Sequence, residues 1–456
     1  MIQSVNPATG ELLAEFIDAD DAAIETALAG AHLAQKDWAR RPLEERCALV
    51  ARLADVLREN KARYARLITL EMGKPIAEAT AEIEKCAVTA QHYAAEAGRY
   101  LAPEVVASNA AHSAVVFDPM GVVLAVMPWN YPFWQFVRFA APALAAGNGA
   151  ILKHASNVPQ CALAIEDAFL EAGFPRGLVG NLLVGPSKVA RILADDRIAA
   201  VTLTGSTGVG SLVAAEAGRL LKPQVLELGG SDPFIVLADA DVEAAAATAV
   251  KARFQNTGQS CIAAKRFLVE DAVADAFTEA MVAKARTLVV GDPLEAATQI
   301  GPMARASLRG ELHGQVERSL AAGARLLLGG APVDGPGAFY QPTILDGVTP
   351  EMAVFGEETF GPAAAIIRVP DADTAVDLAN RSEFGLGAAI WTGDTERAIP
   401  LARRIEAGAV FVNGLVASDA RLPFGGVKQS GYGRELGVYG IRAFTNVKTI
   451  WVGPAR

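Results

Sequence analysis

Cys261 is the residue whose setting most strongly suggests chemistry. It ends the polar segment 254–261 (FQNTGQSC), which contains a glycine and precedes an expected strand at residues 266–269. A thiolate is a strong nucleophile, and nearby positive dipoles can lower the pKa of a thiol. An isolated cysteine is more often a small buried hydrophobe. The surrounding residues instead favour a nucleophile at the edge of a site.

Two further polar residues stand where a nucleophile would need them. Glu227 lies in the apolar run 225–230 (VLELGG), and burial would raise its pKa toward neutrality, as a general base for a hydrolytic water requires. The alternative is an edge-strand glutamate that faces solvent. Asn130 follows an expected strand at 122–127, where its amide and a backbone N–H could form an oxyanion hole. The alternative for Asn130 is a simple turn former.

A glycine-containing loop, TGSTGVG at residues 204–210, joins an expected strand to an expected helix. Such a loop can present N–H groups and the Ser206 hydroxyl to a pyrophosphate at the helix N-terminus. The loop is not a G-x-G-x-x-G sequence, and by itself it is a weak signal.

These residues are spaced along alternating short strands and helices. We expect strands at 122–127, 150–153, 182–184 and 200–203, with helices at 132–144, 159–172, 187–194 and 208–218. A second block has strands at 234–237 and 266–269, with helices at 242–252 and 273–288. This alternation predicts βαβ units and parallel sheets. Residues 21–100 are expected to be mostly helical, residues 114–117 and 447–452 to be β runs, and residues 326–337 to form a Gly-rich hairpin.

Composition limits the class of protein. The 456 residues are 52% hydrophobic and 20% charged, which predicts large cores rather than disorder. The net charge of −10 argues against a nucleic-acid partner. No apolar stretch reaches the length of about 20 residues that a membrane span needs, and the N-terminus does not resemble a targeting peptide. Four widely spaced cysteines and five scattered histidines predict no disulfide framework and no metal site, and a cytoplasmic setting fits.

Seven ordered motifs together resemble the aldehyde dehydrogenase superfamily. They are PWN (128–130), ILKHAS (151–156), TGSTGVG (204–210), LELGG (226–230), NTGQSC (256–261), EETFGP (357–362) and PFGGVKQSGYGRE (423–435). The resemblance runs from residue 6 to the C-terminal β run. It implies an α/β fold with two interlocked Rossmann-like domains and a β oligomerisation arm.

The resemblance also implies domain boundaries. Residues 1–100 and 120–226 would form the coenzyme-binding domain, to which residues 422–440 return. Residues 227–421 would form the catalytic domain. Residues 101–119 and 441–456 would form the arm of a homodimer or homotetramer.

The chemistry implied by the resemblance is covalent. Cys261 would attack an aldehyde carbon to give a thiohemiacetal, and Asn130 would stabilise the oxyanion. Hydride transfer to a nicotinamide would leave a thioester, and Glu227 would activate the water that releases the carboxylic acid. The residues placed at the coenzyme are Trp129, Lys153, Ser156, Gly205, Ser206, Glu358 and Phe360.

Ser156 predicts the coenzyme. Many NAD-preferring members carry a glutamate three residues after the adenosine-site lysine, which is Lys153 here. Serine removes a like-charge clash with a 2′-phosphate and offers it a hydrogen bond. We therefore expect NADP to be used well, with NAD as the alternative.

Arg138 predicts the substrate. It lies eight residues after Asn130, on the helical side of Tyr131 and Trp134. An arginine in an aldehyde tunnel would bind a distal carboxylate, which Ser418 could share. These positions match the pattern of succinate-semialdehyde dehydrogenases. The alternatives are that Arg138 makes a surface or interface ion pair, and that Arg421 holds the carboxylate.

The sequence departs from the family pattern at two positions. Phe139 stands where many members have a lysine that pairs with the position of Glu435, so a proton relay there is not expected. Gln255 stands where some succinate-semialdehyde dehydrogenases place an arginine, so glutarate semialdehyde or an aromatic aldehyde is an alternative substrate. Two different kinds of relative stay open as well, a CoA-acylating enzyme and a non-catalytic structural protein. Glu227 argues against the first, and Cys261 with Glu227 and Asn130 against the second.

Overall fold

Four helices occupy most of residues 21–100, as predicted. The computed structural model describes residues 1–453, and in it the helices are α1 (Asp21–Trp38), α2 (Leu43–Glu59), α3 (Lys61–Met72) and α4 (Ile76–Tyr100). The Asp20 carboxylate caps α1 by accepting from the Ala23 N–H. Gly73, with φ of 80°, ends α3 in the left-handed conformation that glycine adopts readily. A hairpin of β1 (Ile2–Val5) and β2 (Leu12–Phe16) precedes these helices.

The first large sheet has the order β19-β9-β8-β5-β6-β7. Its strands are β5 (Val122–Met127), β6 (Gly149–His154), β7 (Val179–Asn181), β8 (Ile198–Thr204), β9 (Gln224–Glu227) and β19 (Gly431–Tyr432). All pairs are parallel except that of β19 with β9. Strands β5 and β6 are buried throughout, which explains the continuous apolar sequence of β5, since helices cover both faces of a parallel sheet.

The crossover helices of this sheet are α5 (Pro132–Ala145), α6 (Pro159–Glu171), α7 (Val189–Ala194) and α8 (Thr207–Arg219), close to the predicted spans. One predicted strand is wrong. Residues 182–184 form no strand, and β7 lies three residues earlier. Leu182 and Val184 are apolar because they pack into the core from a loop, and that burial imitates a strand in the sequence.

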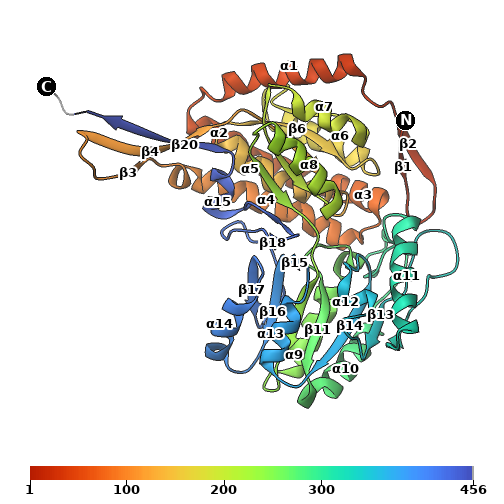
Figure 1. The fold of residues 1–456 in the computed structure, drawn as a ribbon. Helices are drawn as coiled ribbons and strands as arrows, with labels where there is room; N and C mark the ends of the chain where they lie inside the picture. Colours follow the sequence, from red (N-terminus) through yellow and green to blue (C-terminus); the bar gives the residue numbers. More distant parts are fainter. Residues whose placement is uncertain (454–456) are drawn as a thin grey trace.

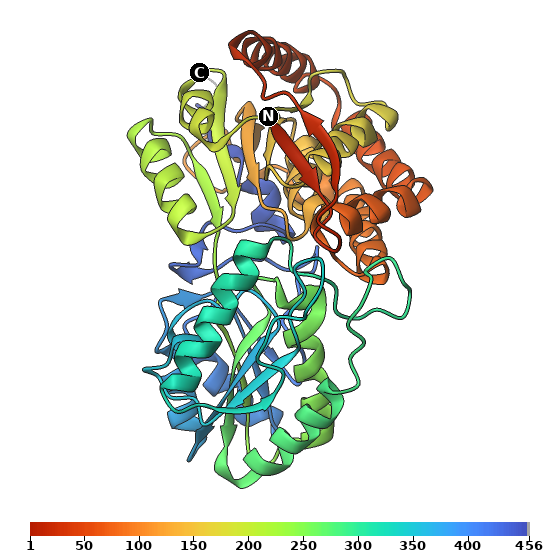
Figure 2. The same ribbon diagram turned by 90° about the vertical axis from the view of Figure 1, so that its right-hand side faces the viewer.

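The second large sheet has the order β12-β13-β14-β11-β10-β16-β17. Its strands are β10 (Asp232–Val236), β11 (Ala264–Glu270), β12 (Arg325–Leu328), β13 (Thr343–Asp346), β14 (Ala363–Val369), β16 (Gly387–Trp391) and β17 (Ala409–Val412). Its helices are α9 (Val242–Phe254), α10 (Asp271–Ala285), α11 (Ala306–Ala321), α12 (Ala353–Gly356), α13 (Ala372–Asn380) and α14 (Thr395–Arg404). The predicted hairpin at 326–337 is only half right, because β12 pairs antiparallel with β13, which lies beyond that span. Figure 2 shows the two sheet units one above the other.

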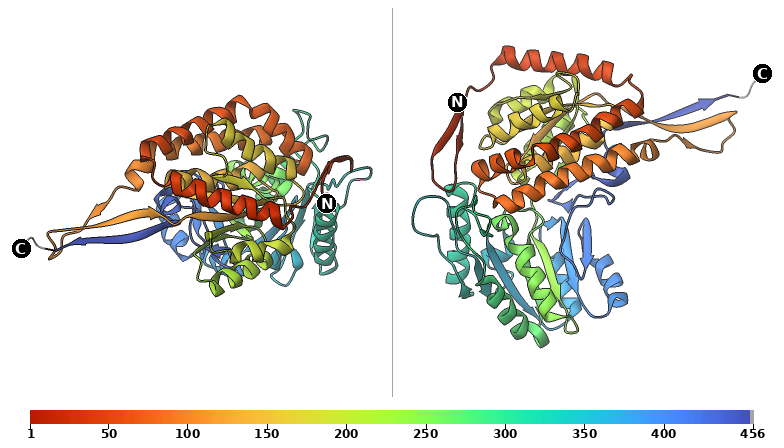
Figure 3. Two further views of the ribbon diagram at one scale, coloured as in Figure 1. Left: turned by 90° about the horizontal axis from the view of Figure 1, so that it is seen from above. Right: turned by 180° about the vertical axis from the view of Figure 1, so that it is seen from behind.

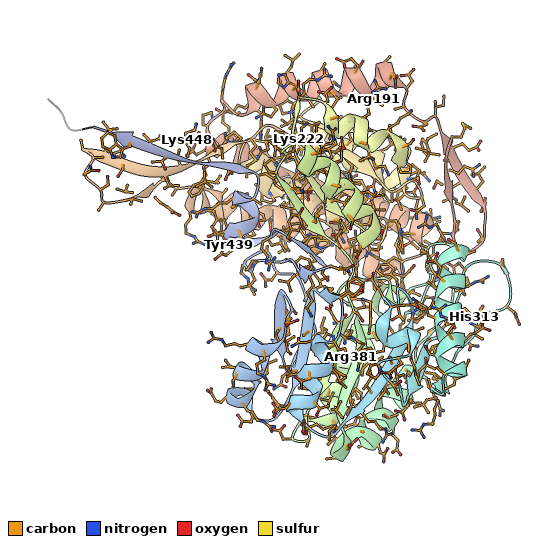
Figure 4. All side chains as sticks on the ribbon, viewed as in Figure 1. Arg191, Lys222, His313, Arg381, Tyr439 and Lys448 are labelled. Carbon is orange, nitrogen blue, oxygen red and sulfur yellow. The ribbon has the colours of Figure 1, made fainter. Side chains whose placement is uncertain are left out.

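A ribbon of three strands projects from the body (Figures 1 and 3). It consists of β3 (Glu104–Val105), β4 (His112–Pro119) and β20 (Thr445–Val452), which contains the predicted β run. Lys448, labelled in Figure 4, lies on this ribbon and pairs with Asp118 across it. Apolar side chains are exposed along it, including Val105, Ile450 and Trp451. Residues 454–456 of the expected arm lie outside the described residues.

The chain passes from the first sheet to the second between the end of β9 at Glu227 and the start of β10 at Asp232. After β17 the chain returns to the first sheet through β18 (Val427–Lys428), β19 and α15 (Gly437–Arg442). Strand β18 pairs with β15 (Phe384–Gly385), which precedes β16 in the chain. The predicted fold class, two Rossmann-like α/β units with a β arm, is confirmed. The domain boundaries stay a prediction. Among residues 1–453, every helix is too short or too polar to traverse a lipid bilayer.

Candidate active site

Cys261 lies on the wall of a cavity of about 770 Å³. The cavity is bounded by α4, α5, α9, the loop 259–263 and the segment 415–424. Just before the cysteine, Asn256 and Thr257 have φ of 54° and 55°, a left-handed conformation that costs energy in non-glycine residues. The Asn256 amide holds this turn by donating to the carbonyl oxygens of Asn130, at 2.9 Å, and Gln259, at 3.1 Å. Strained backbone thus presents the thiol to the cavity.

The Cys261 thiol is protonated at neutral pH in this environment. Burial raises its pKa to about 12, although Arg138 and Lys265 act in the opposite direction. Nearby positive groups do lower this pKa, as expected, but burial raises it by more, so the net shift is upward. A base, or a positive charge brought by a ligand, has to assist ionisation of the thiol.

Glu227 ends β9 and is 2% exposed. Its carboxylate oxygens have no hydrogen-bond partner within residues 1–453. Burial, followed by the charge of Glu435, raises the pKa of Glu227 well above its ordinary value. The alternative of a solvent-facing edge residue is wrong, because β8 and β19 flank this strand on both sides. The raised pKa is what a base that must hold and release a proton near neutral pH requires.

Arg138 and Glu435 form a buried ion pair in which the guanidinium Nε faces the Glu435 carboxylate. The arginine is 2% exposed, and its Nη2 donates to Thr204 Oγ1 at 3.4 Å. The alternative of a surface ion pair is therefore wrong. Arg138 supplies the cation for Glu435 that Phe139 cannot.

The structure brings Arg138 and Glu435 together with Glu227. Glu435 raises the pKa of Glu227 and Arg138 lowers it, so one arginine serves two neighbouring carboxyl groups. Two carboxylates beside one buried cation cannot both ionise without cost.

Asn130 lies between β5 and α5, at the carboxyl end of a parallel strand. Its Nδ2 donates to the Gln259 carbonyl oxygen at 3.1 Å, which fixes the amide beside the Cys261 loop. An amide nitrogen carries two N–H groups, so one stays available to a ligand oxygen. A role in an oxyanion hole stays a prediction.

The cavity is also lined by a cation that the sequence did not indicate. Lys85, on α4, donates from Nζ to Ser418 Oγ at 2.6 Å, and its Nζ lies 4.3 Å from the centre of the Trp134 ring. The only sequence signal for Lys85 is its helical spacing from Glu78 and Glu82, which line the same cavity. Arg421, the second carboxylate candidate, is exposed, pairs with Asp419 and does not line the cavity.

The predicted coenzyme residues lie mainly at the carboxyl ends of β5, β6 and β8, where open α/β sheets bind ligands. Ser206 is the exposed residue before α8, and its hydroxyl makes no bond to the helix. Gly205 adjoins it. Lys153 is buried on β6 without an ion pair in the part of the chain described, and burial lowers its pKa. Ser156 follows β6 and is exposed.

The remaining coenzyme candidates lie between the two sheets. Trp129 meets Phe360 edge-on, with ring centres 5.7 Å apart. Glu358 accepts from the Gly230 N–H at 2.9 Å and lies 3.8 Å from Lys265 Nζ. A Cβ at Gly229 would come within 2.6 Å of the Glu358 carboxylate, so the turn needs glycine there. A free helix N-terminus at Ser206, and Lys153 without an ion pair within residues 1–453, fit a phosphorylated dinucleotide.

A model of the aldehyde dehydrogenase family matches residues 1–450. The chain belongs to the aldehyde dehydrogenase family. As a family member it is 50% identical over 459 residues to the succinate-semialdehyde dehydrogenase, NADP(+), of Mycolicibacterium paratuberculosis, covering 100% of this chain and 97% of that protein. It is 50% identical over 450 residues to the succinate semialdehyde dehydrogenase, NAD(P)+, Sad of Escherichia coli, covering 98% and 97%.

A solved relative has the same fold as this aldehyde dehydrogenase. The crystal structure of succinic semialdehyde dehydrogenase from Streptococcus pyogenes, in complex with NADP+, superposes with a TM-score of 0.97 at 38% identity and covers 100% of both chains. The dehydrogenase therefore has its sheets and loops in the arrangement of a known member of the family.

Proposed function

We propose that this enzyme oxidises succinate semialdehyde to succinate and prefers NADP over NAD. The observation that carries the substrate is a cavity lined both by Cys261 and by the cations Arg138 and Lys85. A neutral aldehyde cannot compensate the charge of a desolvated cation, whereas a distal carboxylate of the substrate can. The names of the two curated relatives agree with this substrate.

In the proposed reaction Cys261 attacks the aldehyde carbon and forms a thiohemiacetal. The free N–H of Asn130 and the Cys261 backbone N–H stabilise the oxyanion. When bound, the oxidised coenzyme supplies the hydride acceptor. Glu227 then takes a proton from the water that hydrolyses the thioester, and the carboxylic acid leaves.

The coenzyme preference rests on Lys153 and Ser156. Lys153, which forms no ion pair within residues 1–453, can pair with a 2′-phosphate, and an exposed serine after the strand offers that phosphate a hydrogen bond. Ser206, Gly205 and the α8 N-terminus would hold the pyrophosphate. Trp129, Glu358 and Phe360 would hold the nicotinamide riboside.

A homodimer or homotetramer in the cytoplasm belongs to the same proposal. Its support is the projecting β ribbon, whose apolar side chains lie exposed along β20. Exposed apolar side chains on a projecting sheet favour association with another chain.

Steady-state kinetics test the substrate and the coenzyme together. We expect kcat/KM for succinate semialdehyde to exceed that for hexanal by at least about 100-fold, because a bound carboxylate makes charge-assisted hydrogen bonds in the cavity that hexanal cannot make. NADP should give the higher kcat/KM of the two coenzymes. Equal values for the two aldehydes would contradict the substrate, and a strong NAD preference would contradict the coenzyme.

A further inference from the structure

Lys85 is the half-buried cation of the cavity whose charge has no partner. Its Nζ makes one hydrogen bond, to the neutral Ser418 hydroxyl. No carboxylate within residues 1–453 comes within ion-pair distance of it. An ammonium carries three N–H donors. The two N–H groups of Lys85 that do not bond to Ser418 are therefore free to bind a ligand.

The other cations of the cavity differ from Lys85. Arg138 is paired with Glu435 and bonded to Thr204. Lys284 pairs with Glu243 at 3.0 Å. Lys251 is exposed, so water solvates its charge. Lys85 alone among the cavity cations of the described chain is both withdrawn from water and without a counter-charge.

The surroundings of Lys85 fix its position rather than neutralise it. The Trp134 ring lies 4.3 Å from Nζ, a cation–π distance, and Ser418 holds the ammonium from the opposite segment of the cavity wall. Burial, followed by the nearby Arg138, lowers the pKa of Lys85 to about 8. A charge that is held in place and costly to desolvate is stabilised by an anionic ligand.

We propose that Lys85, together with Ser418, makes the direct contact with the distal carboxylate of the substrate, and that Arg138 is a positioning residue for Glu435 and Glu227. This assignment rests on the proposed function for the identity of the substrate. It places specificity for anionic aldehydes on α4, a helix that contributes none of the residues expected from sequence.

The test compares Lys85→Met with Lys85→Arg, using Lys251→Met as the matched control. The readout is the ratio of kcat/KM for succinate semialdehyde to that for hexanal, with NADP as coenzyme. We expect Lys85→Met to lower this ratio roughly 10- to 100-fold, the effect of one hydrogen bond to a charged group. Lys85→Arg should restore most of the ratio, and Lys251→Met should keep the wild-type ratio. Thermal melting of each variant checks its fold.

Glutarate semialdehyde as a third aldehyde separates the two proposals. If the wild type prefers succinate semialdehyde over hexanal and Lys85→Met keeps that preference, the role of Lys85 is overturned and the function stands. If the wild type prefers glutarate semialdehyde and Lys85→Met loses that preference, the substrate is wrong and Lys85 stands. If the wild type prefers neither anionic aldehyde over hexanal, both proposals are overturned. If Lys85→Arg is as impaired as Lys85→Met, charge recognition by Lys85 is contradicted.

Discussion

The aldehyde end and the coenzyme end of the site are built differently. At the aldehyde end, Glu227, Glu435 and Arg138 are buried and act mainly on one another. At the coenzyme end, Ser156 and Ser206 are exposed, and the Ser206 hydroxyl makes no bond to α8. The protein itself therefore sets the charge state of the aldehyde end, whereas the ligand completes the coenzyme end. Substitutions should cost catalysis and stability at the first and change selectivity at the second.

Cys261→Ala should have the largest effect on kcat of the substitutions considered. It should leave binding at the coenzyme end unchanged. Without the nucleophile no covalent intermediate forms, so kcat should fall by at least about 10⁴-fold. Binding of NADP, measured by fluorescence titration, should stay within a few-fold of the wild type. The control is Cys47→Ala, which removes a half-buried thiol from α2 outside the cavity. Residual turnover near the wild-type level would contradict a covalent mechanism.

Glu435→Gln should destabilise the protein, since it removes the carboxylate that forms the ion pair with the buried Arg138. Removing one partner of a buried ion pair costs about 3–5 kcal/mol, so denaturant unfolding should show a loss of this order. Glu435 raises the pKa of Glu227 and Arg138 lowers it. The rise of activity with pH that follows Glu227 deprotonation should therefore move to lower pH in the variant.

The control for Glu435→Gln is an exposed pair. Glu216→Gln breaks a surface ion pair with Arg219, and surface pairs contribute about 0–1 kcal/mol. If the free energy of unfolding falls by the same small amount in both variants, the buried ion pair contributes no more to stability than the exposed one. The contrast between the two ends of the site is then contradicted.

Ser156→Glu should change selectivity with little change in stability. A carboxylate beside the 2′-phosphate repels it, and the ratio of kcat/KM for NADP to that for NAD should fall about 30-fold or more. The melting temperature should stay near that of the wild type, because the position is exposed. Ser307→Glu, at an exposed serine of α11, is the control. An unchanged coenzyme ratio would remove Ser156 from the coenzyme site.

The pH dependence of substrate preference should be the smallest effect. Lys85, whose pKa is about 8, is charged below this pH and neutral above it. The ratio of kcat/KM for succinate semialdehyde to that for hexanal should therefore fall about tenfold in total as the pH rises through 8, and titrations that affect both aldehydes cancel in this ratio. The Lys85→Arg ratio should stay flat. The groups that act on Lys85 are Glu82 and Cys86 on α4, Arg138 on α5 and Asp419 on the facing loop.

The sequence predicted best those elements whose local pattern and tertiary setting agree. Strand β5 is a continuous apolar run, and α5 begins at Pro132, which favours the first turn of a helix. Strand β7 was misplaced because it includes Gly180 and Asn181, poor strand formers, while the neighbouring loop carries buried apolar residues. Packing, not propensity, decides such short strands.

In the site, the sequence indicated residue types but not their partners. Arg138 was found from its spacing, yet its pairing with Glu435 depends on the segment 423–435 returning to the first sheet. Lys85 was missed because Ser418 lies 333 residues away along the chain. The raised pKa of Cys261 comes from burial, which no local motif reports.

The backbone of Glu227 is held from two sides, since it pairs with Thr204 of β8 and with Gly431 of β19. Loop movement therefore cannot carry this carboxyl group toward or away from the cysteine. The motion left to it is rotation about its own side-chain bonds, a local event far faster than the opening of domains. We expect the crystallographic signature of catalysis at this residue to be alternative rotamers on an unchanged strand.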